Sequence, residues 1–518
     1  MAKQRSAVLI ASLIWGGSIL LSRLIGVIRE AVLGRVLGVT GETDVYFTAF
    51  LLPDFLNYLL AGGALSLVFI PLFNEHLTRG DEAGGWEAFS AIATVLSLML
   101  VVATGALWLL APGLTDWIAP GFDAPSAQAL VRLTRIMLPA QIFHLLGGLL
   151  SATLQARDKH ALPALAPLLY NVCVIAGGLL GGAAMGAEGF AWGVLVGSAL
   201  GPFGLPLVGC LREGLHFRPT LNIKHPALRT YLVRSLPIML GLSVIAVDDW
   251  ILRQQGSLLA AGSIATITFA KTLMKVPMGV FGLATGAAAF PTLTRLLSEG
   301  RRAEAYTLLS SAVKRMLVLA FAAQVLLTCA GPEIARVIYG GRLEAGGHQE
   351  AIGSALGWIC VGLWAWSAQS LIARGFYAQG NTWTPTIVGT AVALLCYPLY
   401  VGLRVELGVD GLAMASSVAV TAYMVILMAL LRRQFPGTPD GFVTYFAKMV
   451  PATAAGIGAG IAARPLVMQT GITVVDGAAA GIVGGLVFGA ATLVLRVEEV
   501  REVGALVAGK VRRRLRRG

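Results

Sequence analysis

Long apolar stretches, each bounded by charged or turn-forming residues, recur along the whole 518-residue chain. A helix needs about 20 such residues to cross a bilayer. The stretches cover approximately 7–29, 45–74, 87–112, 129–154, 161–182, 188–211, 230–252, 265–294, 307–330, 351–373, 383–403, 409–431, 443–463 and 472–495. Charged residues make up 13% of the chain, about half the share usual for soluble domains. The chain is therefore predicted to be an all-α polytopic membrane protein of about fourteen transmembrane helices.

Basic residues gather on alternate connections between these stretches. The connections on the side of the two termini hold roughly 23 Lys and Arg residues, and the others hold roughly five. Because such an excess marks the cytoplasmic side, both termini are expected in the cytoplasm. The first stretch lacks a small-residue cleavage site and is expected to be a retained helix. The Arg-rich tail is expected to lie on anionic lipid head groups, and no nucleic-acid partner is predicted.

Short patterns recur along the chain at an offset of about 220 residues. The segment 156–163 matches 378–385, the turn 186–191 matches 408–413, and the Phe-Pro pattern at 69–71 matches 290–291. Six predicted helices separate each pair, so the two halves share one orientation in the membrane. Such parallel duplication is typical of transporters with a substrate cavity between two lobes. The predicted parts are an N-terminal lobe (1–225), a C-terminal lobe (226–436), two extra helices (437–497) and a basic cytoplasmic tail (498–518).

A distinctive pattern opens the chain. It reads Ser22-Arg23-Leu-Ile-Gly26-Val-Ile-Arg29-Glu30, then Thr43-Asp44, Phe50-Leu-Leu-Pro53-Asp54 and Gly63-Ala64-Leu-Ser66. This pattern resembles the first two helices of the MurJ (MviN) lipid II flippases, a family of the multidrug/oligosaccharidyl-lipid/polysaccharide exporter superfamily. The segments 133–139, 161–171 and 374–378 continue the resemblance in both predicted lobes.

The resemblance implies a transporter, not an enzyme. Its substrate would be lipid II, the undecaprenyl-pyrophosphate-linked disaccharide-peptide from which peptidoglycan is made. Alternating access would move lipid II from the cytoplasmic to the periplasmic leaflet of the inner membrane. Two six-helix lobes would carry the transport, and the two extra helices would form a groove for the lipid tail. No cofactor is expected, membrane lipids are the other expected partners, and the expected state is a monomer.

Arg23 and Arg29 lie inside the first apolar stretch. A charge there costs at least about 2.5–3.5 kcal/mol unless it faces water or a partner. An arginine is always charged and can bind a pyrophosphate through two parallel hydrogen bonds, so both are predicted to contact the head group. They lie about 120° apart on an ideal helix, so facing one cavity would need a bend, for which Gly26 is placed. The alternative for Arg29 is an interfacial position or a pair with Glu30 or Asp44.

Two positions depart from the family pattern. Where the family usually carries arginine, this chain has Asn57 and Thr272. Lys271 and Lys275 flank Thr272 one turn apart on one helical face, and they are predicted to restore the positive charge. The alternative for the two lysines is an interfacial pair at a helix end. The predicted substrate-binding residues are Arg23, Arg29, Asn57, Ser66, Lys271 and Lys275.

Adjacent carboxylates, Asp248 and Asp249, end the predicted seventh helix. They point about 100° apart, so at most one is expected to face a cavity. A cation site is one interpretation, but the stretch 391–400 lacks the Asn or Asp of the family's sodium site, and no metal site is predicted. Pairing with Arg253 or Lys271 is favoured. The residues predicted to have structural or charge-pairing roles are Asp44, Asp248, Asp249 and Gly26.

Two other functions compete with the flippase. An exporter of another lipid-linked oligosaccharide, or a multidrug antiporter, would share the superfamily fold. An anionic cavity would favour the drug antiporter, whereas the arginines and lysines predicted in this cavity favour an anionic substrate. A polyprenyl-phosphate-using enzyme would need clustered acidic metal ligands or a general base. The sequence offers one close carboxylate pair without a D-x-x-D pattern or a neighbouring His, which disfavours the enzyme.

Overall fold

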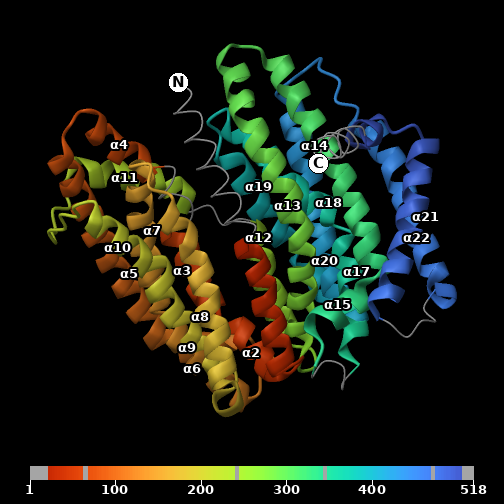
Figure 1. Cartoon of the computed structure of the whole chain (residues 1–518), viewed down its shortest axis with the longest axis horizontal. Coiled ribbons are helices and arrows are strands. Elements are labelled where there is room, and N and C mark those ends of the chain that lie inside the picture. The colour runs from red at the N-terminus through yellow and green to blue at the C-terminus, as the bar shows by residue number, and fades with distance from the viewer. Residues whose placement is uncertain (1–20, 62–67, 240–243, 342–346, 468–472, 505–518) are drawn as a thin grey trace, which may run out of the picture. The chain divides into compact units, whose positions relative to one another are not determined.

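The structure is a computed structural model that describes residues 21–61, 68–239, 244–341, 347–467 and 473–504 (Figure 1). All regular secondary structure in these ranges is helical. The predicted all-α class is therefore confirmed.

The chain forms two compact units. The first comprises Met1–Leu242 and Arg253–Ala265, and the second comprises Ser243–Leu252 and Thr266–Gly518. The helices α12 (Val244–Gly256) and α13 (Ser263–Ser298) each contain a boundary between the units. These two helices therefore provide continuous backbone connections from one unit to the other.

The first unit is a helical bundle that begins with a helical segment over residues 21–37. The elements that follow are α2 (Gly41–Ala49), α3 (Leu51–Ala61), α4 (Ile70–Thr78), α5 (Glu82–Ile118), α6 (Ala124–Met137), α7 (Ala140–Ala156), α8 (Ala161–Met185), α9 (Ala187–Ser198), the π-helical η2 (Ala199–Gly204), α10 (Leu205–Arg212) and α11 (Pro226–Met239). Carboxylates cap two of the starts: Asp81 accepts the Gly84 N–H at 2.9 Å before α5, and Asp123 accepts the Ser126 N–H at 3.1 Å before α6. Such caps satisfy backbone donors that a helix start leaves open.

The second unit is also a bundle. Besides most of α12 and α13 it contains α14 (Arg302–Cys329), α15 (Gly331–Tyr339), α17 (His348–Cys360), α18 (Leu363–Tyr377), α19 (Trp383–Leu395), α20 (Tyr397–Arg433), α21 (Phe442–Val467) and α22 (Thr473–Val494). The two last helices pack against each other and against α14. Arg464 of α21 also forms an ion pair with Glu333 of α15, at 2.7 Å. The pair of helices outside the sequence repeat is thus integrated into the second unit.

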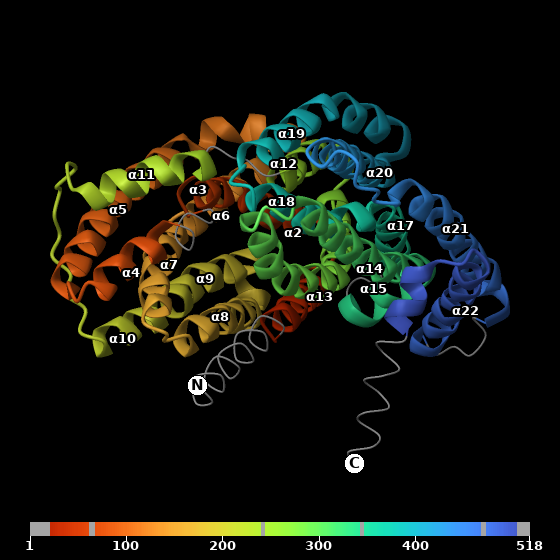
Figure 2. The same ribbon diagram turned by 90° about the horizontal axis from the view of Figure 1, so that it is seen from above.

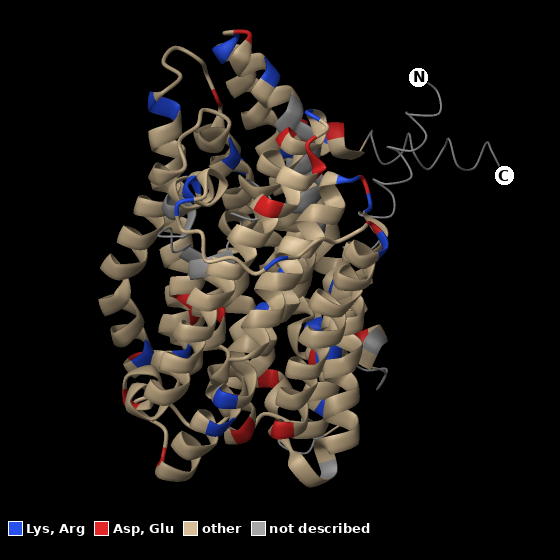
Figure 3. Ribbon diagram, turned by 90° about the vertical axis from the view of Figure 1, so that its left-hand side faces the viewer, with Lys and Arg blue, Asp and Glu red and all other residues tan. Residues whose placement is uncertain are grey.

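Eight spans among the described residues are long and apolar enough to cross a membrane, and a ninth results if α17 and α18, bent by 45°, are counted as one. The eight are Glu82–Ile118, Ala124–Ala156, Ala161–Gly182, Ala187–Arg212, Arg302–Cys329, Tyr397–Arg433, Phe442–Leu466 and Val475–Val494. Figure 3 shows long stretches of these helices without a charged residue. The expected stretches 7–29, 45–74 and 230–252 extend into residues outside the described ranges.

Large apolar side chains on the outside of the helices point to a lipid environment. Leu180 is 87% exposed, Leu395 79% and Val494 80%. Water would make such exposure costly over many residues, whereas lipid tails solvate these side chains well. The chain is a multi-pass membrane protein.

Glycines allow some helices to approach closely. A Cβ on Gly177 of α8 would lie 2.5 Å from the carbonyl oxygen of Gly189 in α9, and a Cβ on Gly147 of α7 would lie 2.0 Å from the carbonyl oxygen of Pro202 in η2. No side chain fits at either distance. Small residues at helix contacts are typical of membrane bundles, where packing replaces the hydrophobic effect as the main attraction.

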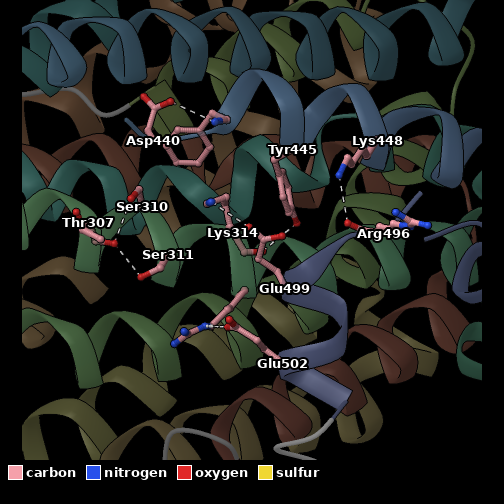
Figure 4. Close-up of polar contacts among 12 residues, drawn as sticks. Thr307, Ser310, Ser311, Lys314, Asp440, Tyr445, Lys448, Arg496, Glu499 and Glu502 are labelled. Carbon is pink, nitrogen blue, oxygen red and sulfur yellow. Dashed lines mark hydrogen bonds and ion pairs between the residues drawn. The ribbon is translucent and has the colours of Figure 1, made fainter. Parts of the chain in front are cut away.

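The segment after α22 is held against α14 by charges (Figure 4). Lys314 pairs with Glu499 at 2.9 Å, and Arg315 pairs with Glu502 at 2.8 Å. The Tyr445 hydroxyl donates to the Lys314 carbonyl oxygen at 2.9 Å and joins α21 to the same place. The described chain therefore ends on a polar cluster at the side of the second unit.

Candidate functional site

Arg23 lies in the helical segment over residues 21–37. Its side chain is half-buried, and it makes no hydrogen bond or ion pair with another described residue. An arginine carries its charge at any physiological pH. Arg23 is thus a fixed cation whose charge is not neutralised by a neighbour within the described part of the chain.

Arg29, six residues further along, is held by two neighbours. Its guanidinium donates to Glu30 Oε1 at 2.5 Å and to Asn171 Oδ1 at 3.2 Å. Asn171 is oriented in turn by donating to the Pro167 carbonyl oxygen at 2.9 Å. The ion pair with Glu30 neutralises the charge on Arg29, so a pyrophosphate would have to compete with a carboxylate that is only 7% exposed.

Asp44 is buried and acts as a helix cap. Its Oδ2 accepts the Gly262 N–H at 2.7 Å, and its Oδ1 accepts the Ala265 N–H at 2.6 Å, both within the first unit. These amides belong to the start of α13, where backbone donors lack intrahelical partners. Gly262 has a φ of +92°, which favours glycine, and a Cβ there would also lie 2.7 Å from Val39. Asp44 therefore joins α2 to the beginning of α13.

Lys271 lies in the second unit and is buried beside both adjacent carboxylates. Its Nζ lies 2.5 Å from Asp248 Oδ2 and 2.5 Å from Asp249 Oδ1. The hydroxyl of Tyr400 donates to the other oxygen of Asp248, and the Trp366 ring lies 5.1 Å from Nζ. The side chains of Lys271 and Asp248 are 5% and 3% exposed. The cluster pairs one cation with two carboxylates inside the helical bundle.

The other predicted substrate residues have different environments. Lys275 of α13 and Asn57 of α3 are exposed, whereas Thr272 is half-buried. Gly26 lies in the continuous helical segment over residues 21–37, and Ser66 lies outside the described residues. The structure thus separates the two lysines: Lys275 is at a surface, and Lys271 is in the interior.

Arg253 does not contact Asp248 or Asp249 through an ion pair. It lies 3.9 Å from Asp54, in the first unit. Of the two cations expected beside the carboxylate pair, Lys271 is the one that binds it.

Three residues of these clusters received no role from the sequence. They are Asn171, which orients Arg29, and Tyr400 and Trp366, which surround the Lys271 cluster. Asn171 and Tyr400 are polar groups within apolar stretches, which is a usable signal because an unsatisfied polar group is costly in a membrane. Trp366 offers no comparable signal, since aromatic residues are common in helical cores.

Proteins of one family have sequences similar to this chain. The profile described as "Lipid II flippase MurJ" matches residues 33–476. The "Probable lipid II flippase MurJ" of Rhizobium tropici is 28% identical over 438 residues, covering 81% of this chain and 80% of the relative. The "Lipid II flippase MurJ" of Burkholderia cenocepacia is 28% identical over 450 residues, covering 84% and 86%. The profile match begins after Arg29, so roles for Arg23 and Arg29 depend on the residue pattern and the geometry.

Solved structures with a similar fold include "Lipid II flippase MurJ, inward closed conformation", with a TM-score of 0.76 and 21% identity over 93% of this chain and 99% of that one. The "Inward-facing conformation of a multidrug resistance MATE family transporter of the MOP superfamily" has a TM-score of 0.67 and 14% identity, and covers 80% of this chain and 98% of that one. At these identities the similarity establishes the fold of the bundle.

Proposed function

The chain belongs to the MurJ family of lipid II flippases, and from this premise we propose that it moves lipid II from the cytoplasmic to the periplasmic leaflet. It is a multi-pass inner-membrane transporter rather than an enzyme. The transport step is alternating access, with both termini on the cytoplasmic side, as the roughly 23 to five bias in basic residues supports.

Arg23 is the observation that carries the proposal for the head-group site. It is a permanent cation in an apolar helix, and no described residue neutralises it. A pyrophosphate is doubly anionic or more, and a guanidinium can bind it through two parallel hydrogen bonds. The same charge disfavours a cationic drug as substrate, so the flippase is preferred over the multidrug antiporter.

Arg29 has a supporting role in this proposal. Its guanidinium is already positioned by Glu30 and Asn171. A pyrophosphate would gain less from Arg29 than from Arg23, because the Glu30 carboxylate must first be displaced. Arg29 therefore has a positioning role, because it ties the helical segment that carries Arg23 to Asn171 of α8.

The lysines of α13 enter the proposal with unequal roles. Lys275 is exposed and on a flexible stem, so it can attract a phosphate as a point charge. Lys271 holds two carboxylates and would have to leave both to reach a substrate. We therefore assign head-group attraction to Lys275 and maintenance of the second unit to Lys271. Asn57 and Ser66 remain proposed polar contacts to the head group.

Complementation of bacteria depleted of their own lipid II flippase tests this function. The unaltered chain should support growth, and lipid II should become accessible to a membrane-impermeant enzyme added outside. Arg23→Ala should abolish both at normal membrane levels. The matched control is Arg35→Ala, an exposed arginine on the same helix, which should retain growth. Full activity of Arg23→Ala would remove Arg23 from the site, and failure of the unaltered chain would refute the flippase itself.

A further inference from the structure

A cavity of about 450 Å³ lies in the first unit, apart from all the residues discussed above. One wall is the start of α5, and the other is the non-helical segment between α10 and α11, which runs beside α5 in Figure 2. The lining residues are Ala83, Trp86, Glu87, Ser90, His216, Arg218, Thr220, Asn222 and His225.

Hydrogen bonds fix the non-helical segment to α5. Ser90 Oγ accepts the Arg218 N–H at 3.1 Å, and Thr94 Oγ1 accepts the Thr220 N–H at 3.3 Å. The Ser90 hydroxyl donates to the His216 carbonyl oxygen at 3.5 Å. The cavity therefore has two walls that are joined to each other, and it is preformed.

The charges in the lining are balanced. Arg218 provides one permanent positive charge and Glu87 one negative charge. Both side chains are exposed, and neither forms an ion pair with another residue in the described ranges. His225 Nδ1 accepts the Ala227 N–H at 3.2 Å, so the neutral ring carries its proton on Nε2 and can donate to an anion there. A ligand with one anionic and one cationic group matches this lining.

The position of the cavity points to a lipid. α5 begins at Glu82 and its apolar stretch begins near residue 87, so the cavity, which α5 lines with residues 83–90, lies where that helix is expected to enter the bilayer and where head groups lie. The adjoining segment exposes Leu221 (64%) and Ile223 (70%) between polar residues. Exposed apolar side chains beside basic ones are typical of a segment that rests in the lipid interface.

We propose that this cavity binds the head group of a phospholipid with a primary ammonium group. Arg218 and His225 Nε2 donate to the phosphate, and Glu87 accepts from the ammonium. An anionic head group without an amine would face Glu87 unfavourably, and a quaternary amine would offer it no hydrogen-bond donor. The cavity is thus a lipid site that is independent of the proposed transport of lipid II.

Native mass spectrometry of the purified full chain with added phosphatidylethanolamine, phosphatidylcholine or phosphatidylglycerol tests the site. We expect phosphatidylethanolamine to be retained about three- to fivefold more tightly than either of the others, as one partly exposed ionic contact allows. Glu87→Gln should abolish the preference for phosphatidylethanolamine over phosphatidylcholine. Arg218→Gln should weaken the binding of both of these lipids. Tighter binding of phosphatidylglycerol to the unaltered chain would overturn the proposal.

Two matched controls separate the site from general charge effects. Arg229→Gln removes an exposed cation of α11 outside the lining, and Asp116→Asn removes an exposed carboxylate at the far end of α5. Neither should change lipid preference. If Arg229→Gln weakens binding as much as Arg218→Gln, or if Glu87→Gln leaves the preference intact, the cavity is not the site. Both Glu87 and Arg218 are exposed, so folding should be retained, and Glu87→Gln alone decides the matter if Arg218→Gln does not fold.

Discussion

Replacing Lys271 by methionine should strongly destabilise the second unit. Lys271 and Asp248 have side chains 5% and 3% exposed, so neither can regain much water when the other is lost. Removing one partner of a buried pair costs about 3–5 kcal/mol, because the other charge stays buried and uncompensated. Asp249 is 24% exposed and adds less, since water can reach it. We therefore expect Lys271→Met to lower the free energy of unfolding by about 3–5 kcal/mol.

A second substitution shows whether the buried charge is the cause. In Lys271→Met/Asp248→Asn the stranded carboxylate becomes a neutral amide that can still accept from Tyr400. The double variant should be more stable than Lys271→Met alone by about 1–3 kcal/mol, a positive coupling between neighbouring sites. If Lys271 and Asp248 acted independently, the double variant would instead be less stable than Lys271→Met alone.

Unfolding of the purified protein in increasing dodecyl sulfate, followed by tryptophan fluorescence, measures these differences. Lys275→Met is the matched control, because it removes a lysine from the same helix at an exposed position, and it should change stability by less than about 1 kcal/mol. If Lys271→Met and Lys275→Met unfold alike, the two carboxylates are neutral or hydrated, and the reasoning from burial fails.

Two more substitutions test contacts far apart in the sequence. Asp44→Asn should lower the free energy of unfolding by about 1–3 kcal/mol, because one of the two backbone N–H groups that Asp44 accepts at the start of α13 then faces an amide NH₂. Hydrogen exchange of the backbone amides at 262–265 should become faster, and unchanged exchange would argue against the cap. Gly147→Ala should destabilise by about 1–3 kcal/mol, because its Cβ meets a backbone carbonyl oxygen at 2.0 Å. Gly105→Ala, whose Cβ has no neighbour within 4 Å, should be neutral or stabilising by about 0.5–1 kcal/mol; equal unfolding of the two glycine variants would contradict the close approach of α7 to η2.

Local properties of the chain were enough to predict its class. The length of an apolar stretch and the scarcity of charge act on each segment separately, because lipid requires each spanning helix to satisfy its own backbone. The same holds for the bias of basic residues, which predicts orientation one connection at a time. Family membership was also readable, from turn and polar residues at fixed spacings in the first two helices.

The partners of the charged residues were decided by the tertiary structure. From the sequence, Lys271 was both a predicted head-group residue and one of two predicted partners of the carboxylate pair, and the packing places it against Asp248 and Asp249 of another helix. Asp44 caps a helix that begins more than 200 residues later. A buried charge takes whichever opposite charge or backbone donor the packing brings within about 3 Å, and that choice depends on how helices distant in sequence pack together. The three cations differ in the same way: Lys271 meets carboxylates of another helix, Arg29 pairs with the adjacent Glu30 and is held in place by Asn171 of α8, and no described residue neutralises Arg23.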